Sequence, residues 1–207
     1  MIRPPGRHGV VFSESSDGDV RNDVSARSEV SRAVGIEEEW ATVRQVHGSR
    51  ILRVEAPGDA GEADGLWTTR IGLPLAVFTA DCLGVVLHAD GAAGVAHAGW
   101  RGVDSGVVAR LRSEMTKAGH DPHSAEVGPG IGPCCFEVGD DVASRFPWAG
   151  ATTSWGTTSV VLADALAPQL DGLDTWFSGA CTMHEPDWFS HRENGTTARL
   201  GTVGWVP

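Results

Sequence analysis

The chain has 207 residues and a formal net charge of −11, with 16 Lys and Arg against 27 Asp and Glu. This acidic balance excludes a general binder of the nucleic-acid backbone, because such a protein needs clustered basic residues. A chain of this length buries a sizeable core, so we expect one domain spanning residues 1–207.

Four cysteines at irregular spacing are not typical of a small disulfide scaffold, and the N-terminal segment shows no signal peptide. No window approaches the roughly 20 apolar residues of a membrane span. We therefore expect a cytoplasmic protein with reduced thiols and with neither a membrane nor nucleic acid as partner.

Short apolar runs, glycines and capping residues predict the following elements in chain order. They are a strand over 10–12, a helix capped by Asn22 or Asp23 and stopped by Gly35, strands over 41–46 and 51–54, a loop over 56–64, strands over 75–79, 85–88 and 94–96, a helix from Asp104 or Ser105 to about Lys117, a strand end at 126–127, a helix over 140–146, a strand over 160–162, a helix over 163–170, and strands over 175–177 and 198–206. Because strands and helices mix without regular βαβ alternation, we predict an α+β fold of mixed β-sheets packed as a sandwich between helices.

Three potential metal ligands follow apolar strands and precede glycine-containing turns. They are His47 in QVHG, Cys82 in TADCLG and His97 in AHAGWRG. One thiolate and two imidazoles are sufficient to hold a zinc ion with one coordination position open, which is the arrangement of a catalytic zinc site. The spacing matches no zinc finger, and a buried cysteine or a strand-end histidine taken alone is usually a packing residue, so both interpretations stay open from the residues alone.

Polar residues beside these three suggest further roles. Asp81 is expected to orient a metal-bound histidine, to act as a general base, or simply to cap a turn. Arg101 is suited to gripping a phosphate or carboxylate, and Trp100 either stacks on a planar base or packs in the core. Near the C-terminus, His191 and Arg192 follow an aromatic pair and either reach the site or form a surface turn. We interpret Cys134 and Cys135 as structural, because adjacent cysteines do not easily chelate one tetrahedral ion.

The motifs QVHG, ADGLWTT, TADCLGVVLHA, AHAGWRG, IGPCCFEVG, CT and FSHRENG occur in this order. With them the chain resembles the laccase-domain family, also described as multicopper-polyphenol-oxidase-like or peptidoglycan-editing-factor-like. The resemblance covers about residues 9–206. It implies a single domain of mixed sheets between helices and a zinc ion bound by His47, Cys82 and His97.

The resemblance also implies a zinc-dependent purine nucleoside phosphorylase that cleaves adenosine, inosine, guanosine or methylthioadenosine with phosphate, with adenosine deamination as a second activity. Its partners would be a nucleoside and phosphate. Cys82 would be a zinc ligand and not a nucleophile, Asp81 or His191 would handle protons, and Arg101, with Arg44 or Arg192, would neutralise phosphate. The sequence leaves a monomer and a weak dimer open.

Three other functions remain open at this point. A copper-dependent polyphenol oxidase would need many paired histidines, and the chain has eight histidines with no His-x-His pair, so copper is the less favoured metal. A hydrolase that edits peptidoglycan precursors would use Cys82 as nucleophile and His97 as base without metal. A metal-stabilised binding module would have a closed, four-ligand site.

Overall fold

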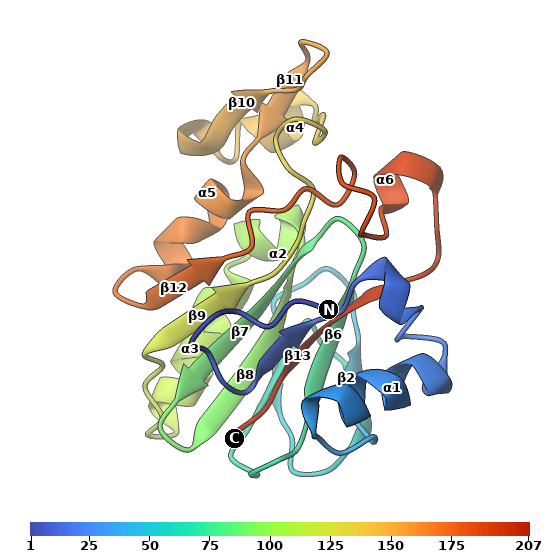
Figure 1. The fold of residues 1–207 in the computed structure, drawn as a ribbon. Coiled ribbons are helices and arrows are strands. Elements are labelled where there is room, and N and C mark those ends of the chain that lie inside the picture. Colours follow the sequence, from blue (N-terminus) through green and yellow to red (C-terminus); the bar gives the residue numbers. More distant parts are fainter.

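Two β-sheets face each other at the centre of the structure, and helices cover their outer faces (Figure 1). The computed structural model describes all residues from 1 to 207. The first sheet has the strand order β1 (Val10–Phe12), β13 (Leu200–Gly204), β6 (Leu75–Thr79), β2 (Ala41–Arg44), β4 (Gly58–Glu62). The second has the order β12 (Asp174–Phe177), β9 (Ser124–Val127), β7 (Leu83–Ala89), β8 (Ala92–Ala98), β5 (Gly65–Thr68), β3 (Ile51–Arg53).

Both sheets are mixed. In the first, β13 pairs antiparallel with β1 and β6, whereas β2 pairs parallel with β4 and β6. In the second, β7 pairs antiparallel with β8 and β9, whereas β9 and β12 are parallel, as are β3 and β5. A separate hairpin pairs β10 (Gly150–Thr152) with β11 (Thr158–Val160). The α+β fold of mixed sheets between helices is thus confirmed, in a single domain.

The helices are mostly short. They are α1 (Val24–Val34), α2 (Trp100–Asp104), α3 (Val107–Lys117), α4 (Asp140–Ala143), α5 (Leu162–Leu166) and α6 (His191–Asn194), with 3-10 turns at Ser15–Asp17, Pro147–Ala149 and Ala167–Leu170. None of the helices has the length and apolar character that crossing a membrane requires.

Side-chain alternation along the strands builds three apolar layers. Phe12, Val77 and Val86 belong to the layer between the two sheets. On the outer face of the first sheet, α1 contributes Val30. On the outer face of the second sheet, α3 contributes Leu111. Because strand neighbours point to opposite faces, each central strand serves two layers at once.

Several predicted boundaries were wrong, for identifiable reasons. The segment predicted as a loop over 56–64 contains β4, an edge strand of exposed and half-buried residues that pairs through its backbone and lacks an apolar pattern. The helix predicted from Asp104 or Ser105 corresponds to α3 and begins later, at Val107, because Gly106 interrupts the chain at φ +73° after the separate short helix α2. The elements that were not predicted include β5, which has only four residues, the short elements α2 and β10, and α6, which is capped by the Ser190 side chain.

The two sheets are in contact where β7 meets β13, and this contact yields a stability prediction. A Cβ at Gly84 would lie 1.9 Å from Thr202 Oγ1 and 2.6 Å from Thr202 Cβ. Rotation of Thr202 cannot relieve the second conflict, so we expect Gly84→Ala to lower the free energy of unfolding by about 1–3 kcal/mol. Gly150→Ala is the control, because that position has open space around it, and we expect a change within about 0.5 kcal/mol. Urea unfolding of both variants measures the difference, and equal stabilities would contradict the assigned packing.

Candidate metal centre and cleft

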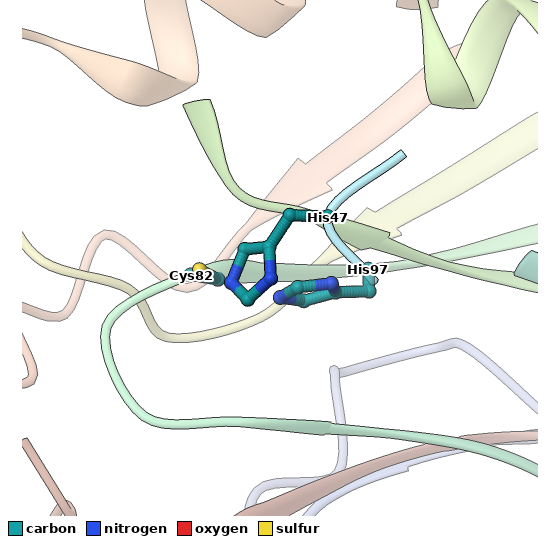
Figure 2. Close-up of side chains that lie close together, drawn as sticks. All are labelled: His47, Cys82 and His97. Carbon is teal, nitrogen blue, oxygen red and sulfur yellow. The ribbon is translucent and has the colours of Figure 1, made fainter. Parts of the chain in front are cut away.

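Three side chains from different parts of the chain converge at one end of the facing sheets (Figure 2). His47 follows β2, Cys82 lies in the turn between β6 and β7, and His97 lies in β8. Their ligand atoms all lie within 4.8 Å of one another, and the two imidazole rings pack edge to face with centroids 4.7 Å apart. The structure therefore assembles the His47–Cys82–His97 triad that the sequence placed at strand ends.

A buried carboxylate organises two of these three residues. Asp64 is fully buried, and its oxygens accept hydrogen bonds from the main-chain N–H groups of Val46 (3.2 Å), His47 (2.9 Å) and Gly48 (2.7 Å). The same carboxylate accepts a bond of 2.9 Å from Nδ1 of His97. A carboxylate bonded to Nδ1 fixes the imidazole orientation and leaves Nε2 for a metal, which is the usual arrangement behind metal-binding histidines.

One residue of the triad and one residue beside it adopt left-handed backbone conformations. His47 has φ 59° and Asp81 has φ 90°, values that non-glycine residues rarely adopt. His47 is held there by the Asp64 carboxylate. Asp81 is held by three bonds: Thr182 Oγ1 to its Oδ1 (2.8 Å), the N–H of Arg192 to its Oδ2 (2.7 Å) and the N–H of Ile131 to its main-chain carbonyl (2.8 Å). Such conformations cost free energy and persist only where surrounding bonds enforce them.

The electrostatics of the triad favour a thiolate. Burial acts to raise the pKa of Cys82, but hydrogen bonds and charge interactions with His47 and His97 outweigh it and lower this pKa to about 6. Burial acts to lower the pKa of His97, but the Asp64 and Cys82 partners raise it to about 9. Between these values the metal-free triad holds a thiolate beside an imidazolium. The Cys82 sulfur is thus already in the form that ligates metals, and His97 gives up a proton on binding.

The triad fits a metal ion by its donor set and by the space around it. Two imidazole nitrogens and one sulfur suit a borderline-soft divalent ion. At Gly99 a Cβ would lie 2.7 Å from the Cys82 sulfur and 3.3 Å from His47 Cδ2, so a glycine is required for the chain to pass this close. The remaining side of the triad faces a cleft of about 350 Å³. This geometry leaves room for a ligand or substrate next to the three donors.

The cleft is lined by the triad together with arginines and aromatic rings. Its lining comprises Arg21, Gln45, His47, Phe78, Thr79, Ala80, Asp81, Cys82, His97, Ile131, Phe136, His191, Arg192 and Arg199. None of these three arginines forms an ion pair with a carboxylate. Six other arginines of the chain each pair with an aspartate or a glutamate. The cleft therefore offers unneutralised positive charge to an anionic ligand.

The predicted site residues divide into two groups. Asp81, His191 and Arg192 line the cleft together with the triad. Arg44 and Arg101 do not line it. Arg44 is exposed and pairs with Glu62 on the neighbouring strand at 3.3 Å, because β2 and β4 place these residues opposite each other. Arg101 lies over the ring of Trp100, which itself packs against the core.

The role of orienting a histidine belongs to Asp64 and not to Asp81. Asp64 was missed because it lies in the segment 56–64 that we predict as a loop. Its position directly before Gly65, the first residue of the buried strand β5, is the signal that could have identified it. Arg21 and Arg199 were also missed, since each is far from the triad in sequence. Gln45 was missed too, although it precedes His47 by only two residues. The Gln45 amide bonds both the N–H and the carbonyl of Phe78 at 2.8 Å, joining β2 to β6.

Residues 12–207 match the sequence profile of the family described as multi-copper polyphenol oxidoreductase laccase. The chain belongs to this family. It is 37% identical over 214 residues to a Deinococcus radiodurans protein named purine nucleoside phosphorylase, which covers 96% of this chain and 83% of that protein. A Streptomyces coelicolor protein of the same name is 36% identical, covering 91% of this chain and 85% of that protein.

Solved structures of similar proteins share the fold. The structure of YlmD from Geobacillus stearothermophilus has a TM-score of 0.83 with 28% identity, covering 98% of this chain and 94% of that one. The structure of the Bacillus licheniformis hypothetical protein YfiH has a TM-score of 0.79 with 27% identity, covering 88% of this chain and 80% of that one. The two facing mixed sheets are therefore a family property.

Asp64 provides a test of the metal centre. In Asp64→Asn an amide N–H₂ replaces one oxygen that accepts backbone hydrogen bonds, and the negative charge behind His97 is lost. We expect the affinity for Zn²⁺ to fall by about 10- to 100-fold, as for other partners of metal-bound histidines. Asp90→Asn removes the same charge from an exposed side chain and should leave the affinity for Zn²⁺ unchanged. Zn²⁺ titration against a chelating dye measures both, and an unchanged affinity in Asp64→Asn would sink this assignment.

Proposed function

We propose that this protein is a zinc-dependent purine nucleoside phosphorylase, which splits a purine nucleoside with inorganic phosphate. One observation carries the proposal: a His–His–Cys triad shares a cleft with three arginines that have no acidic partner. An anionic co-substrate is what such a cleft would bind. The names of the similar proteins from Deinococcus radiodurans and Streptomyces coelicolor support the same reaction.

Zinc would be held by His47, Cys82 and His97. When bound, it supplies Lewis-acid polarisation of an oxygen ligand at its open position. The donor set, the thiolate character of Cys82 and the Asp64 bond to His97 all suit this ion. Copper is less suitable for an oxidase here. Apart from the triad, the only other group of three metal-ligating side chains consists of cysteines alone, so the histidine clusters of a multicopper oxidase are missing.

Arginines of the cleft would bind phosphate. The Arg192 guanidinium donates to the Glu137 carbonyl at 2.8 Å and lies over the Phe136 ring, and Arg199 donates to the carbonyls of Thr196 and Ala198. These bonds hold both side chains in place without neutralising their charge. An arginine fork that is already oriented loses less entropy when it binds an oxyanion.

The nucleoside would occupy the apolar side of the cleft, where the rings of Phe78 and Phe136 and the side chain of Ile131 offer packing surface for a purine. His191 would act as the general acid. Its Nδ1 lies 3.3 Å from the Thr196 carbonyl, which leaves Nε2 free, and the side chain is exposed in the cleft. Both oxygens of Asp81 already accept hydrogen bonds, so Asp81 would orient Thr182 and the Arg192 backbone and would accept a proton only secondarily.

The proposed phosphorolysis involves no oxidation or reduction. A phosphate oxygen forms a bond to the ribose C1′ while the bond from C1′ to the purine N9 breaks. The electron pair of that bond goes to the base, and His191 supplies a proton to the leaving purine. The positive charges of Arg192 and Arg199 hold the phosphate against the sugar, which offsets the entropy of bringing two substrates together. Adenosine, inosine, guanosine and methylthioadenosine are the proposed substrates.

Adenosine deamination is the proposed second activity, in which water adds at the purine C6 and ammonia leaves. It differs from phosphorolysis in needing no phosphate, so a nucleoside panel with and without phosphate separates the two.

The free Cys82, Cys134, Cys135 and Cys181 thiols suit the cytoplasm, where we place the protein. Activity without metal would favour the peptidoglycan hydrolase, and oxygen uptake on phenols would favour the oxidase.

Removal of a triad ligand tests the proposed reaction. We expect Cys82→Ala and His47→Ala to reduce phosphorolysis of adenosine by about 100-fold or more, because loss of a ligand should exceed the 10- to 100-fold cost typical of outer partners. The control is His123→Ala, which removes another exposed histidine that lies outside the cleft and should retain full activity. Release of free purine base, followed by chromatography, measures the rate. An intact, zinc-loaded protein that releases no base from any of the four nucleosides would contradict the proposal.

A charge-matched pair tests the phosphate site. Arg192→Met should lower kcat/KM for phosphate by about 10- to 100-fold, which corresponds to losing a charged hydrogen bond of about 1.5–3 kcal/mol. Arg44→Met removes the same charge from the same acidic protein, but outside the cleft, and should change it less than about twofold. Initial rates at varied phosphate and saturating nucleoside measure both. Equal effects of the two substitutions would mean that only the overall charge matters.

A further inference from the structure

A second cluster of metal-ligating side chains lies outside the triad. The sulfurs of Cys134, Cys135 and Cys181 all lie within 4.8 Å of one another. Cys134 Sγ is 3.5 Å from Cys181 Sγ and 3.3 Å from Cys135 Sγ. We had interpreted Cys134 and Cys135 as structural because they are adjacent. The structure folds them so that both sulfurs meet that of Cys181, which we name the thiol cluster.

Two tight turns hold the thiol cluster in place. In the first, the N–H groups of Cys135 and Phe136 both donate to the Gly132 carbonyl at 3.0 Å. In the second, the N–H of Glu185 donates to the Cys181 carbonyl at 3.1 Å, and Glu185 Oε1 accepts from the Cys181 N–H at 2.8 Å. The two turns are joined to each other, since the segments at Gly130 and Cys181 form a parallel β-bridge. The three sulfurs therefore meet without any large rearrangement.

The backbone around the Cys181 sulfur is arranged as for a metal-binding thiolate. The N–H of Gly132 donates to Cys181 Sγ at 3.1 Å. A Cβ at position 132 would lie 3.2 Å from that sulfur and 3.4 Å from Cys134 Sγ, so the glycine lets the backbone lie against both. An N–H directed at sulfur stabilises negative charge on it, and a buried hydrophobic cysteine has no need of such a donor.

The spacing of the sulfurs also suits one ion. A tetrahedral centre with metal–sulfur bonds of about 2.3 Å has sulfur–sulfur edges of about 3.8 Å. The observed 3.3 and 3.5 Å need only a small expansion. Cys135 and Cys181 are buried, whereas Cys134 is half-buried and provides a path for entry. All three donors are sulfur, and thiolate donors select soft ions over hard ones.

We propose that Cys134, Cys135 and Cys181 form a second metal site, for a soft, thiophilic metal ion bound by three thiolates. Binding of a divalent ion releases three thiol protons and forms three metal–sulfur bonds, with no oxidation or reduction. The site shares no ligand with the triad and does not rest on the proposed phosphorolysis.

The test uses Cd²⁺ as the probe and reduced, metal-free Cys82→Ala protein, in which the triad has lost its sulfur. We expect one equivalent of Cd²⁺ to bind with a thiolate-to-cadmium charge-transfer band in the ultraviolet, and all three remaining thiols to be protected from a thiol-reactive dye. Adding Cys181→Ser should weaken binding by about 100-fold or more, beyond the effect of an outer partner. Met183→Leu is the matched control, because it removes a neighbouring sulfur outside the cluster and should change nothing. Mg²⁺, a hard ion, should not compete.

Several outcomes would overturn the second site: no absorption band, unprotected thiols, or unchanged Cd²⁺ binding after Cys181→Ser. A loss of two mass units on Cd²⁺ treatment would also overturn it, since the thiols would then have formed a disulfide. If Cys82→Ala shows no cooperative unfolding, the wild-type protein with one equivalent of Zn²⁺ takes its place. A second equivalent of metal that protects three thiols supports the site there, and its absence refutes it.

Discussion

The Asp64 carboxylate is the constraint on which the triad depends. It is fully buried, and a buried charge is tolerated only when it is paired and hydrogen-bonded. Three consecutive main-chain N–H groups and the His97 imidazole meet this requirement together. The same four bonds hold His47 in a left-handed conformation and direct His97 Nε2 toward Cys82. Removing the carboxylate would therefore disturb two ligands at once, even though Asp64 itself does not face the cleft.

The facing sheets explain why the ligands meet. His47 follows a strand of the first sheet, His97 belongs to the second, and Cys82 lies on the connection between the sheets, where β6 leads into β7. Three strands from two layers can approach this closely only where side chains are absent between them. Gly84 against Thr202 and Gly99 against Cys82 supply that space, so close packing of the sheets and closure of the triad have the same physical origin.

The sequence predicted the fold class, most strands and the triad, because each depends on local apolar patterns that end at a distinctive residue. Arg44 was expected to help neutralise phosphate, but β2 turns its side chain toward Glu62. Arg199, from the other end of the chain, takes part in the cleft instead. The meeting of Cys181 with Cys134 likewise depends on a pairing of distant loops, which no local pattern encodes.

The thiol cluster and the cleft share their supporting segments. The loop that carries Cys134 also carries Ile131, whose N–H donates to the Asp81 carbonyl, and Thr182, next to Cys181, donates to the Asp81 carboxylate. Asp81 in turn precedes Cys82 and holds a left-handed conformation that only such bonds maintain. An ion bound by the three sulfurs would fix both turns and, through them, the backbone from which the Cys82 sulfur projects. Metal in the second site would then make the first more rigid without touching a substrate.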